Sequence, residues 1–585
     1  MRISKIHIIG FRNFNDEEIT FQDKTLVIGA NDVGKTNLIY ALRLLFDKSI
    51  SERDLDLSDS DYNAYSGTNQ IEITVTIADV VEECLLSTFG GSVKDGTLLI
   101  RYTNSKNGAY QLFVGFSEDT LTEITTRQYI RRLNMQCVDT NRDLFGFLKH
   151  ERVQMLRLAK EKLSEAATLE DEQKAVEIQE KLDSINAQVS SMHYITNALD
   201  HVNQELGKLS IHNEDQTVQF VAGESDAGKL LDNLTLAYSS TDHPLTLGGD
   251  GRNNQIFLAT WIAKQNIQKS IDHVTFYAIE EPEAHLHPHQ QRKLSEYIQN
   301  HFNDQVFITS HSPHIASRFD PQSMVRLYPQ AKYTHAACGG CSPMLQKVIN
   351  AFGYRLNALS AEVFFADGVF LVEGTSEVLF YNALAKALSI DLDRLNISII
   401  SVEGIGFKPY VAVCNALNIP WVLRTDNDIF PKPTNKPTKK YYAGISRIMG
   451  ILQDIFAGTT NSLCDYWDQH QSENEWAYQS EPPANATALN SYVRSQAVSY
   501  GLFVSEVDLE TDLANSPLKN TLLTHYNKRA VNTLIKAMQT KKAENMMHFL
   551  SQNHNSLSCL SGDNIVLPLN DLKSKVEERI HPTND

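Results

Sequence analysis

The order of apolar and polar positions in the first 45 residues is typical of two strands, a glycine-rich loop and a helix. The apolar run Thr25–Ile28 predicts a buried strand, and the spacing of apolar residues over Asn37–Leu45 predicts a helix. Alternating positions continue to about residue 140, as in QIEITVTIADV from Gln70. We therefore expect a β-rich domain with a functional loop between one strand and one helix.

A different pattern, with apolar residues three and four positions apart, covers Asp143–Leu209. Its central part, ERVQMLRLAKEKLSEAATLEDEQKAVEIQEKLDSINAQV, has no glycine or proline and is rich in Glu, Lys, Ala and Leu, so helices are predicted. Two interpretations stay open for this insert. It is either a helical dimerisation surface or a solvated helical hairpin with no partner.

Strand and helix patterns alternate in the second half of the chain. An α/β pattern runs from Pro244 to Tyr328, residues 331–360 are predicted to be a linker, and a βαβαβ unit with a parallel sheet follows. The predicted strands and helices of this unit are Val369–Glu373, Ser376–Leu388, Ile397–Val402, Pro409–Leu417 and Pro420–Thr425. A mostly helical stretch to about Val498, a strand in Gly501–Glu510 and terminal helices complete the expected order.

The composition is that of a globular chain of several domains, with 585 residues, 42% of them hydrophobic and 21% charged. Seven cysteines are scattered along it, and their odd number favours reduced thiols in a cytoplasmic protein. No uninterrupted apolar stretch reaches the length of about 18 residues that a transmembrane helix needs. The apolar run at the N-terminus is too short for a signal peptide.

The net charge of −18 argues against DNA binding over a wide surface, because phosphate neutralisation supplies much of that affinity. DNA contacts would have to come from local basic patches and from metal ions held on carboxylates. The segment PKPTNKPTKK (Pro431–Lys440) is one such patch. It either follows backbone phosphates or is a plain flexible loop.

The sequence GANDVGKT, from Gly29 to Thr36, fits the phosphate-binding P-loop and has the strand and helix that this motif requires on either side. Backbone N–H groups of such a loop and of the helix N-terminus surround the phosphates. Lys35 is expected to reach the β- and γ-phosphates, and Thr36 to bind Mg²⁺. The nucleotide-binding residues predicted here are Gly29, Asn31, Gly34, Lys35, Thr36 and Asn37.

Two later strands end in polar residues that suit an ATPase. HVTFYAIEEPE (His273–Glu283) ends in carboxylates, of which Glu280 and Glu281 are the candidates to join the Mg²⁺ shell and to polarise the attacking water. VFITSHSPH is a second buried strand, after which His311 is placed to sense the γ-phosphate. The alternative is a strand that ends in a surface acidic turn.

The order of these motifs resembles that of the ABC ATPases of the SMC and RecF type. LGGDGRNNQ (Leu247–Gln255) stands where that family carries its signature loop, although the usual sequence there is LSGGQ. The family usually has Asp where Glu280 stands, and its FRNF-like segment implies a place for Arg12 near the nucleotide. HLHPHQ and the lone pair Cys338 and Cys341 are interpreted as structural, because a zinc site needs further ligands at suitable spacing.

Carboxylates follow two strands of the predicted parallel sheet. FLVEGTSE places Glu373 and Glu377 after the first strand, and WVLRTDND places Asp426 and Asp428 after the third. The carboxyl ends of parallel strands share one edge of the sheet, where ligand sites form. Oxygen ligands suit Mg²⁺ or Mn²⁺, and two such ions can activate water and stabilise the leaving oxygen of a phosphodiester. The two motifs together predict a metal-dependent nuclease site.

These acidic motifs and the intervening SVEGIG resemble the Toprim domain. An ABC-type head followed by Toprim resembles the OLD (overcoming lysogenization defect) family over nearly the whole chain. The resemblance implies an α/β fold of two domains. Residues 1–345 would form an ABC/SMC-type P-loop ATPase head, including a helical dimerisation insert at about 143–209. Residues 346–585 would form a Rossmann-like Toprim nuclease domain, with a helical insertion at about 441–498. It also implies that Asp508 and Glu510 complete the metal shell and that Lys542 is the catalytic lysine.

Within the OLD family, the motifs are most similar to those of the nuclease subunits of Gabija anti-phage systems. This similarity implies a nucleotide-regulated endonuclease that cuts double-stranded DNA beside a UvrD-like helicase, with ATP and Mg²⁺ at the P-loop and Mg²⁺ or Mn²⁺ at the Toprim site. ABC-type heads enclose nucleotide between two P-loops, so a homodimer or a dimer of dimers is expected. The alternatives are an SMC/RecF-like DNA-repair or structural ATPase with an inactive Toprim module, and a topoisomerase or primase.

Overall fold

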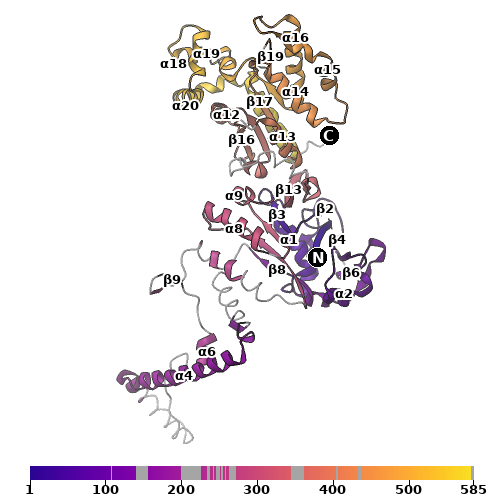
Figure 1. Cartoon of the computed structure of the whole chain (residues 1–585), viewed down its shortest axis with the longest axis vertical. Helices are drawn as coiled ribbons and strands as arrows, with labels where there is room; N and C mark the ends of the chain where they lie inside the picture. The colour runs from indigo at the N-terminus through magenta and orange to yellow at the C-terminus, as the bar shows by residue number, and fades with distance from the viewer. Residues whose placement is uncertain are drawn as a thin grey trace. The chain divides into compact units, whose positions relative to one another are not determined.

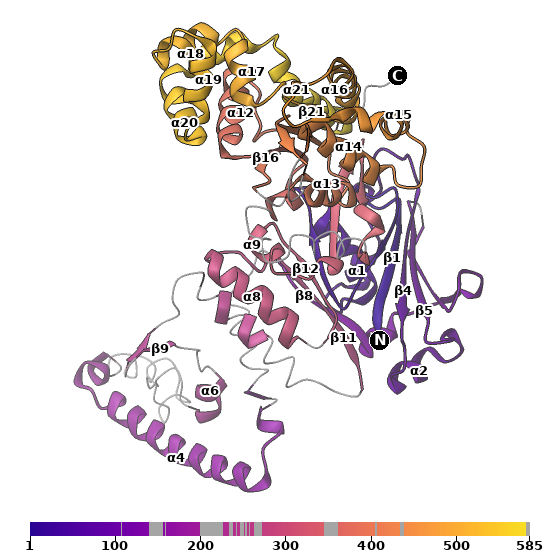
Figure 2. The same cartoon turned by 45° about the horizontal axis from the view of Figure 1, so that its top comes forward.

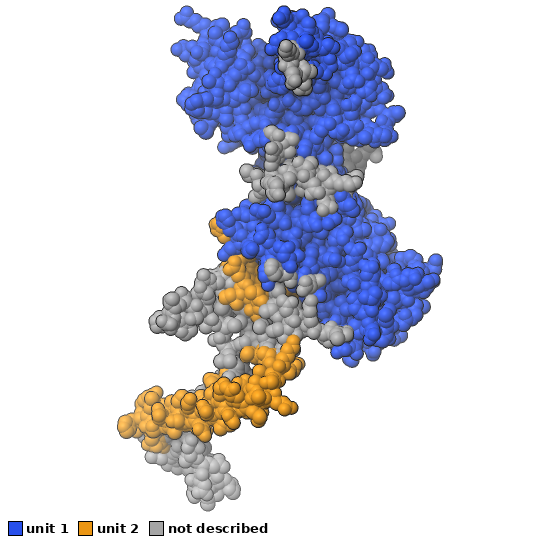
Figure 3. Space-filling model, in the orientation of Figure 1, with its two compact units in different colours: residues 1–139, 271–283, 288–585 blue, residues 140–270, 284–287 orange. Residues whose placement is uncertain are grey.

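The chain divides into two compact units (Figure 3): residues 1–139, 271–283 and 288–585 form the first, and residues 140–270 with 284–287 form the second. The computed structural model describes residues 1–106, 108–139, 156–157, 159–198, 200, 226–232, 238–240, 243–245, 251, 254–256, 258–261, 272–302, 304–343, 361–403, 406–432 and 438–580. No helix among these residues is long and apolar enough to cross a membrane.

An antiparallel sheet opens the first unit, in the order β2–β1–β4–β5–β6–β7 (Figure 1). Its strands are β1 (Arg2–Ile9), β2 (Asp16–Thr20), β4 (Gln70–Ala78), β5 (Leu98–Ser105), β6 (Gln111–Gly115) and β7 (Thr122–Ile124). In β4 the apolar residues alternate with polar ones, and Ile71, Ile73, Val75 and Ile77 are all buried. The predicted β-rich start of the chain is therefore confirmed.

A second sheet, in the order β14–β13–β3–β12–β11–β8, carries the P-loop. Its strands pair in parallel, except for β13 with β14. They are β3 (Lys24–Ile28), β8 (Leu133–Val138), β11 (Val274–Glu280), β12 (Val306–Thr309), β13 (Met324–Gln330) and β14 (Tyr333–Ala336). Helix α1 (Lys35–Phe46) packs against strands of both sheets, so a single apolar core lies beneath the loop. The predicted linker at 331–360 is corrected at its start, because β14 pairs with β13 there.

The described part of the second unit is dominated by helix α4 (Glu165–Ser190), which confirms a helix in the predicted insert. Ser164 begins it by accepting a hydrogen bond from the Ala167 N–H, and none of its residues is buried. Short elements α6 (Ala227–Asp232), β9 (Tyr238–Ser240) and β10 (His243–Leu245) are also described. Most of the predicted signature segment Leu247–Gln255 lies outside the described residues.

The C-terminal part of the first unit is built on a parallel sheet in the order β16–β15–β17–β21. Its strands and flanking helices are β15 (Gly368–Val372), α12 (Thr375–Ala387), β16 (Ile397–Ser401), α13 (Phe407–Ala416), β17 (Trp421–Thr425), β21 (Leu502–Val504) and α21 (Leu567–Ile580). The predicted βαβαβ unit is confirmed to within two residues at each end. The predicted strand in Gly501–Glu510 is wrong beyond Val504, because helix α17 (Leu509–Asn515) begins with Asp508 as its capping residue.

Two groups of helices flank this sheet (Figure 2). One group is α14 (Ala443–Ile455), α15 (Ser462–His470) and α16 (Ala484–Ala497), and the other is α17, α18 (Lys519–His525), α19 (Val531–Gln539) and α20 (Lys542–Asn553). A small antiparallel sheet, β18 (Ile429–Pro431), β19 (Lys439–Tyr442) and β20 (Glu475–Ala477), precedes and interrupts the first group. The predicted loop Pro431–Lys440 is thus wrong at both ends, where Pro431 pairs with Lys440.

The remaining helices of the first unit are short or lie near the P-loop sheet. They are α2 (Glu83–Phe89), α8 (Pro288–His301) and α9 (Pro313–Ala316).

Beside β3, strand β13 carries Arg326, whose side chain is fully buried. Its guanidinium donates to the carbonyls of Phe364 and Ala366, at 3.2 and 2.7 Å, just before β15 begins. Burial lowers the pKa of Arg326 to about 10, still high enough for the group to be charged at neutral pH.

Candidate active sites

The P-loop is shaped by a glycine that no other residue could replace without a clash. Gly34 has φ of 101°, and a β-carbon there would lie 2.0 Å from the Asn13 amide nitrogen. Helix α1 begins directly after it, at Lys35. The Lys35 ammonium donates to the carbonyls of Gly29 and Ala30, at 3.0 and 2.7 Å, and burial lowers its pKa to about 8. The lysine is therefore folded back onto its own loop, within reach of the phosphate position.

Glu280, the last residue of β11, meets the P-loop. Its Oε2 accepts a hydrogen bond of 2.9 Å from the Thr36 hydroxyl, and burial raises its pKa. The parallel order β3–β12–β11 brings the two strand ends to the same edge of the sheet. The carboxylate and hydroxyl predicted to share Mg²⁺ are thus in contact.

Glu281 and His311 form a second contact at this edge. Glu281 has φ of 44°, a left-handed conformation that turns the chain sharply after β11. One of its oxygens lies 3.4 Å from His311 Nε2, and burial lowers the pKa of His311. Glu283 was not predicted as a site residue, yet it accepts hydrogen bonds of 2.7 Å from the Ser310 hydroxyl and the His311 N–H. It therefore fixes the loop that carries the histidine.

Arg12, predicted to lie near the nucleotide, lies against the first turn of α1. Its guanidinium donates to Asn37 Oδ1 at 2.8 Å and to Asp61 at 2.9 Å, and it stacks over the ring of Tyr40 at 4.5 Å. Asn31, by contrast, is exposed at the turn of the loop. Asn37 is thus oriented by Arg12, a contact that the sequence motif does not reveal.

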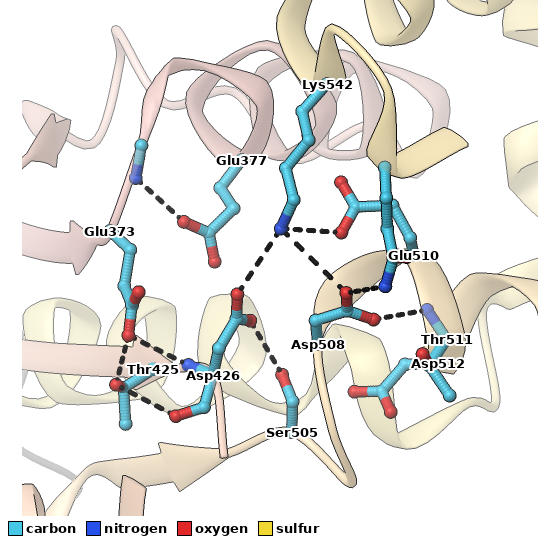
Figure 4. Close-up of polar contacts among 12 residues, drawn as sticks. Glu373, Glu377, Thr425, Asp426, Ser505, Asp508, Glu510, Thr511, Asp512 and Lys542 are labelled. Carbon is cyan, nitrogen blue, oxygen red and sulfur yellow. Dashed lines mark hydrogen bonds and ion pairs between the residues drawn. The ribbon is translucent and has the colours of Figure 1, made fainter. Parts of the chain in front are cut away.

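The second site lies at the carboxyl ends of β15 and β17 (Figure 4). Glu373 follows β15, and its Oε1 accepts hydrogen bonds from the Thr425 hydroxyl at 2.5 Å and the Asp426 N–H at 3.0 Å. The two motifs predicted to face each other across neighbouring strands therefore touch. Asp426 is buried, whereas Asp428 is partly exposed one residue before β18.

Asp508 and Glu510 join this edge from the start of α17. Asp508 caps the helix by accepting from the Thr511 N–H at 2.8 Å, and its other oxygen accepts from Gln539 at 2.7 Å. Glu510 is buried in the first turn of the same helix. A helix N-terminus favours negative charge, so a cap and first-turn acid suit this position.

Lys542, at the start of α20, lies at the centre of these acids. Its ammonium is 3.0 Å from Glu510, 3.6 Å from Asp426 and 3.9 Å from Asp508 (Figure 4). Burial lowers the pKa of Lys542, but these carboxylates outweigh it and leave the pKa raised. The preceding Lys541 instead pairs with Glu544 at 3.0 Å and is mostly exposed. Only the second lysine of the pair thus faces the site.

The carboxylates repel one another and are poorly solvated. Burial, reinforced by Glu377 and Glu373, raises the pKa of Asp426 to about 8. Burial raises the pKa of Glu377 to about 7, and one oxygen of Glu377 is buried without a hydrogen-bond partner. Burial also raises the pKa of Asp428 and of Glu510. Burial opposes ionisation of Asp508 too, but its hydrogen bonds from Thr511 and Gln539 leave its pKa lowered.

The donor set fits a divalent cation. Hard carboxylate oxygens are the ligands that Mg²⁺ and Mn²⁺ prefer, and the unpaired Glu377 oxygen is a buried acceptor in need of a cation. Among the described residues, no three His, Cys, Asp or Glu side chains already converge tightly enough to hold an ion. Lys542 stands between Asp426 and Glu510 instead. Small rearrangements of these side chains would accompany metal binding.

Two arginines at this site were not predicted as site residues: Arg424, inside WVLRTDND, and Arg447, outside the quoted motifs. Arg447, from α14, pairs with Glu373 and also donates to the Thr425 hydroxyl. The buried Arg424 donates to Ser505 at 3.0 Å, pairs with Asp512 and thereby fixes the segment between β21 and α17. No spacing rule links α14 to the acidic motifs, so only the folded chain identifies Arg447.

Family matches agree with this architecture. Residues 1–142 and 117–316 match the AAA ATPase domain family, and residues 364–428 match the family described as overcoming lysogenization defect protein-like, TOPRIM domain. An ATPase domain followed by a TOPRIM domain is thus the class that the fold and the sites define. The chain belongs to the AAA ATPase domain family, whose match spans more than half of it, and its TOPRIM segment is similar to that of the OLD-like proteins.

Two relatives are similar over most of their length. Endonuclease GajA of Bacillus cereus (strain VD045) is 25% identical over 477 residues, which cover 77% of this chain and 79% of that protein. The OLD nuclease of Thermus scotoductus (strain ATCC 700910 / SA-01) is 26% identical over 449 residues, covering 73% and 82%. These matches confirm the predicted fold class, the predicted resemblance to the OLD nucleases and the enzyme class, a nuclease with an ATPase domain.

Proposed function

We propose that the protein is a metal-dependent endonuclease that cuts double-stranded DNA and is regulated by nucleotide. The observation that carries this proposal is the convergence of Asp426, Asp508 and Glu510 on Lys542 at one edge of the TOPRIM sheet. These residues come from three separate segments, and their burial is costly unless the site binds a cation. A site of this kind suits phosphodiester hydrolysis.

The carboxylates would hold Mg²⁺ or Mn²⁺, which supplies an activated water and stabilises the leaving oxygen. The ligands we assign are Glu373, Glu377, Asp426, Asp428, Asp508 and Glu510. Lys542 would release Asp426 and donate to the non-bridging oxygen of the phosphate as negative charge develops there. A lysine ammonium is protonated at neutral pH, as this role requires.

The P-loop would bind ATP with Mg²⁺. Lys35 would exchange the carbonyls of Gly29 and Ala30 for the β- and γ-phosphates, while Thr36 and Glu280 share the ion. Glu281 and His311 lie where an attacking water and the γ-phosphate are expected. The other loop residues in this assignment are Gly29, Asn31, Gly34 and Asn37, and Arg12 would act by orienting Asn37.

ABC-type heads enclose nucleotide between two P-loops, and this chain has one P-loop motif. We therefore propose that two chains enclose the nucleotide together in a homodimer. The helical insert would offer a second surface, through which two such dimers could form a dimer of dimers. Nucleotide would then alter the spacing of the TOPRIM sites. Light scattering tests this: a monomer at micromolar concentration, both with and without ATP and Mg²⁺, would refute the shared site and the regulation built on it.

The similarity to GajA supports a role in anti-phage defence beside a UvrD-like helicase of the GajB kind, in the cytoplasm. We retain residues 1–345 and 346–585 as the proposed ATPase and TOPRIM domains. Supercoiled plasmid with Mg²⁺ or Mn²⁺ tests the central activity. Nicked and linear products are expected; unchanged plasmid would favour a repair or structural ATPase, and relaxed topoisomers a topoisomerase.

A further inference from the structure

An exposed pair of apolar residues directly follows the acidic motif of β17. Ile429 and Phe430 are 41% and 43% exposed, although they come one and two residues after Asp428. All three residues of β18 are exposed. An exposed aromatic ring beside a buried carboxylate cluster is available to contact a ligand.

The hairpin of β18 and β19 gathers aromatic and basic side chains on one face. Phe430 pairs with Tyr441 across the two strands, so both side chains lie on the same side. Lys432 and Lys439 lie on this side as well, because side chains alternate along a strand. Lys432 lies 5.5 Å from the centre of the Tyr441 ring. We call Phe430, Lys432, Lys439 and Tyr441 the hairpin face.

The hairpin face is fixed relative to the acidic motif. The Ala443 N–H donates to the Asp428 carbonyl at 2.9 Å, which continues the register of the hairpin by one pair. In that register Asp428 lies on the same side as Phe430, about 7 Å along the strand. On the other side, Tyr442 packs against Trp476 with ring centres 5.0 Å apart. Tyr442 and Trp476 are thus buried on that side, whereas Phe430 and Lys439 are exposed on the hairpin face.

Charge on the hairpin face suits a polyanion. Lys432 and Lys439 both pair with Glu475, the latter at 3.3 Å, so two ammonium groups share one carboxylate and a positive charge remains. Aromatic rings beside cations bind single-stranded nucleic acid, because bases stack on the rings while the cations contact phosphates. An acidic peptide would use the cations but not the aromatic rings, and a purely apolar partner would use the rings but not the cations.

We propose that the hairpin face stacks an unpaired base of the DNA strand that enters the carboxylate cluster. This inference rests on the proposed nuclease function and deepens it, since it makes the enzyme selective for DNA with unpaired bases near the cut. Phe430 and Tyr441 would supply the stacking surface, and Lys432 and Lys439 would contact the flanking phosphates. Neither aromatic residue touches the carboxylates, so both act in binding rather than in the chemical step.

The test measures DNA affinity by fluorescence anisotropy in Ca²⁺, which suppresses cleavage, on a paired duplex and on the same duplex with a short gap of unpaired thymines. The wild type should bind the gapped DNA more tightly. Phe430→Ala and Tyr441→Ala should each weaken binding to gapped DNA by about tenfold and change binding to the paired duplex little, since stacking on a base is lost. Phe430→Trp should keep the preference.

Tyr65→Ala is the matched control, because Tyr65 is an exposed aromatic residue (61%) of the ATPase domain. It should behave as wild type, and thermal unfolding of every variant verifies folding. Equal losses on both DNAs, or no loss on gapped DNA, would overturn the stacking role. Plasmid cleavage by the wild type is assayed in parallel: its absence would refute the nuclease proposal, whereas cleavage with unaltered variant affinities would refute the hairpin face alone.

Discussion

The two sites both lie at the carboxyl ends of parallel strands, but they are assembled in different ways. The ATPase site takes its lysine and hydroxyl from one short loop, and its lysine bonds to that loop's own carbonyls. The TOPRIM site takes its acids from β15, β17 and α17 and its lysine from α20, far along the chain. The phosphate-binding loop of the first site is thus local in sequence, although Glu280 joins it from β11, whereas in the second site even the lysine and the acids that it contacts come from distant segments.

The difference extends to charge. Around the P-loop, Lys35 with a lowered pKa faces a few acids, and the negative ligand would arrive with the nucleotide. In the TOPRIM site burial, reinforced by neighbouring acids, raises the pKa values of Asp426 and Glu377. The first site is thus prepared for an anion and the second for a cation. Variants that affect one and spare the other would test this contrast.

The largest effect is expected from Asp426→Ala combined with Asp428→Ala. Removing these two ligands should abolish DNA cleavage, because no neighbouring acid can take their place on the same strand end. ATP binding should be unchanged, since the P-loop belongs to another sheet. Glu373→Ala should have the same outcome. Plasmid nicking that persists in the double variant would contradict the metal-site assignment.

Lys542→Met should reduce the turnover number for cleavage by about 100-fold, as expected for loss of one charged donor to the transition state. The matched control is Lys541→Met, because Lys541 pairs with Glu544 and faces away from the acids. Single-turnover kinetics at saturating metal separates the chemical step from binding. Equal rates for the two methionine variants would remove Lys542 from the mechanism.

Lys35→Ala should weaken ATP binding by about 10- to 100-fold, the loss expected for one charge-assisted hydrogen bond to phosphate. The protein should remain folded, because the hydrogen bonds of the ammonium go to carbonyls of its own loop. Isothermal titration calorimetry provides the affinity and thermal unfolding the stability. Unchanged ATP affinity would place the nucleotide elsewhere.

The smallest effect is a pH-dependent change in stability on Asp426→Asn, measured in EDTA. Burial raises the pKa of Asp426 to about 8 in the folded chain, above its unfolded value of about 4. The folded state therefore keeps a proton that the unfolded state loses, and wild-type stability falls as pH rises from about 4 to about 8. The Asn variant should melt a few degrees higher than wild type at pH 8 and show a smaller advantage at pH 6. An advantage independent of pH would contradict this ionisation.

Those residues of both sites that come directly after a hydrophobic strand could be predicted from the sequence. The P-loop, Glu280 and the two acidic motifs each end a hydrophobic run, so their place in the sheet could be inferred. Asp508 was predictable only through family resemblance, and its strand assignment was wrong, because its side chain caps α17 instead. Arg447 could not be predicted as a site residue, because a charged residue on an amphipathic helix is common. Its role follows only from the fold, which places its helix beside Glu373.

The small sheet of β18, β19 and β20 is another feature that the sequence did not predict. Proline and lysine disfavour strands in isolation, so PKPTNKPTKK was predicted to be a loop. In the folded chain the two ends of this segment pair as β18 and β19. The hydrogen bond from the Ala443 N–H to the Asp428 carbonyl continues this pairing toward the end of β17. The contact between the rings of Tyr442 and Trp476 then stabilises a register that local propensity does not specify.

In the proposed TOPRIM site, acids from three distant segments form one metal centre. Fe²⁺ in place of Mg²⁺, with peroxide and ascorbate and without nucleotide, cleaves the backbone next to a bound ion, and mass spectrometry locates the breaks. We predict breaks beside Glu373, Asp426 and Asp508, all lost together in Asp426→Ala/Asp428→Ala. Breaks confined to other segments, or an unchanged pattern in the double variant, would contradict the account.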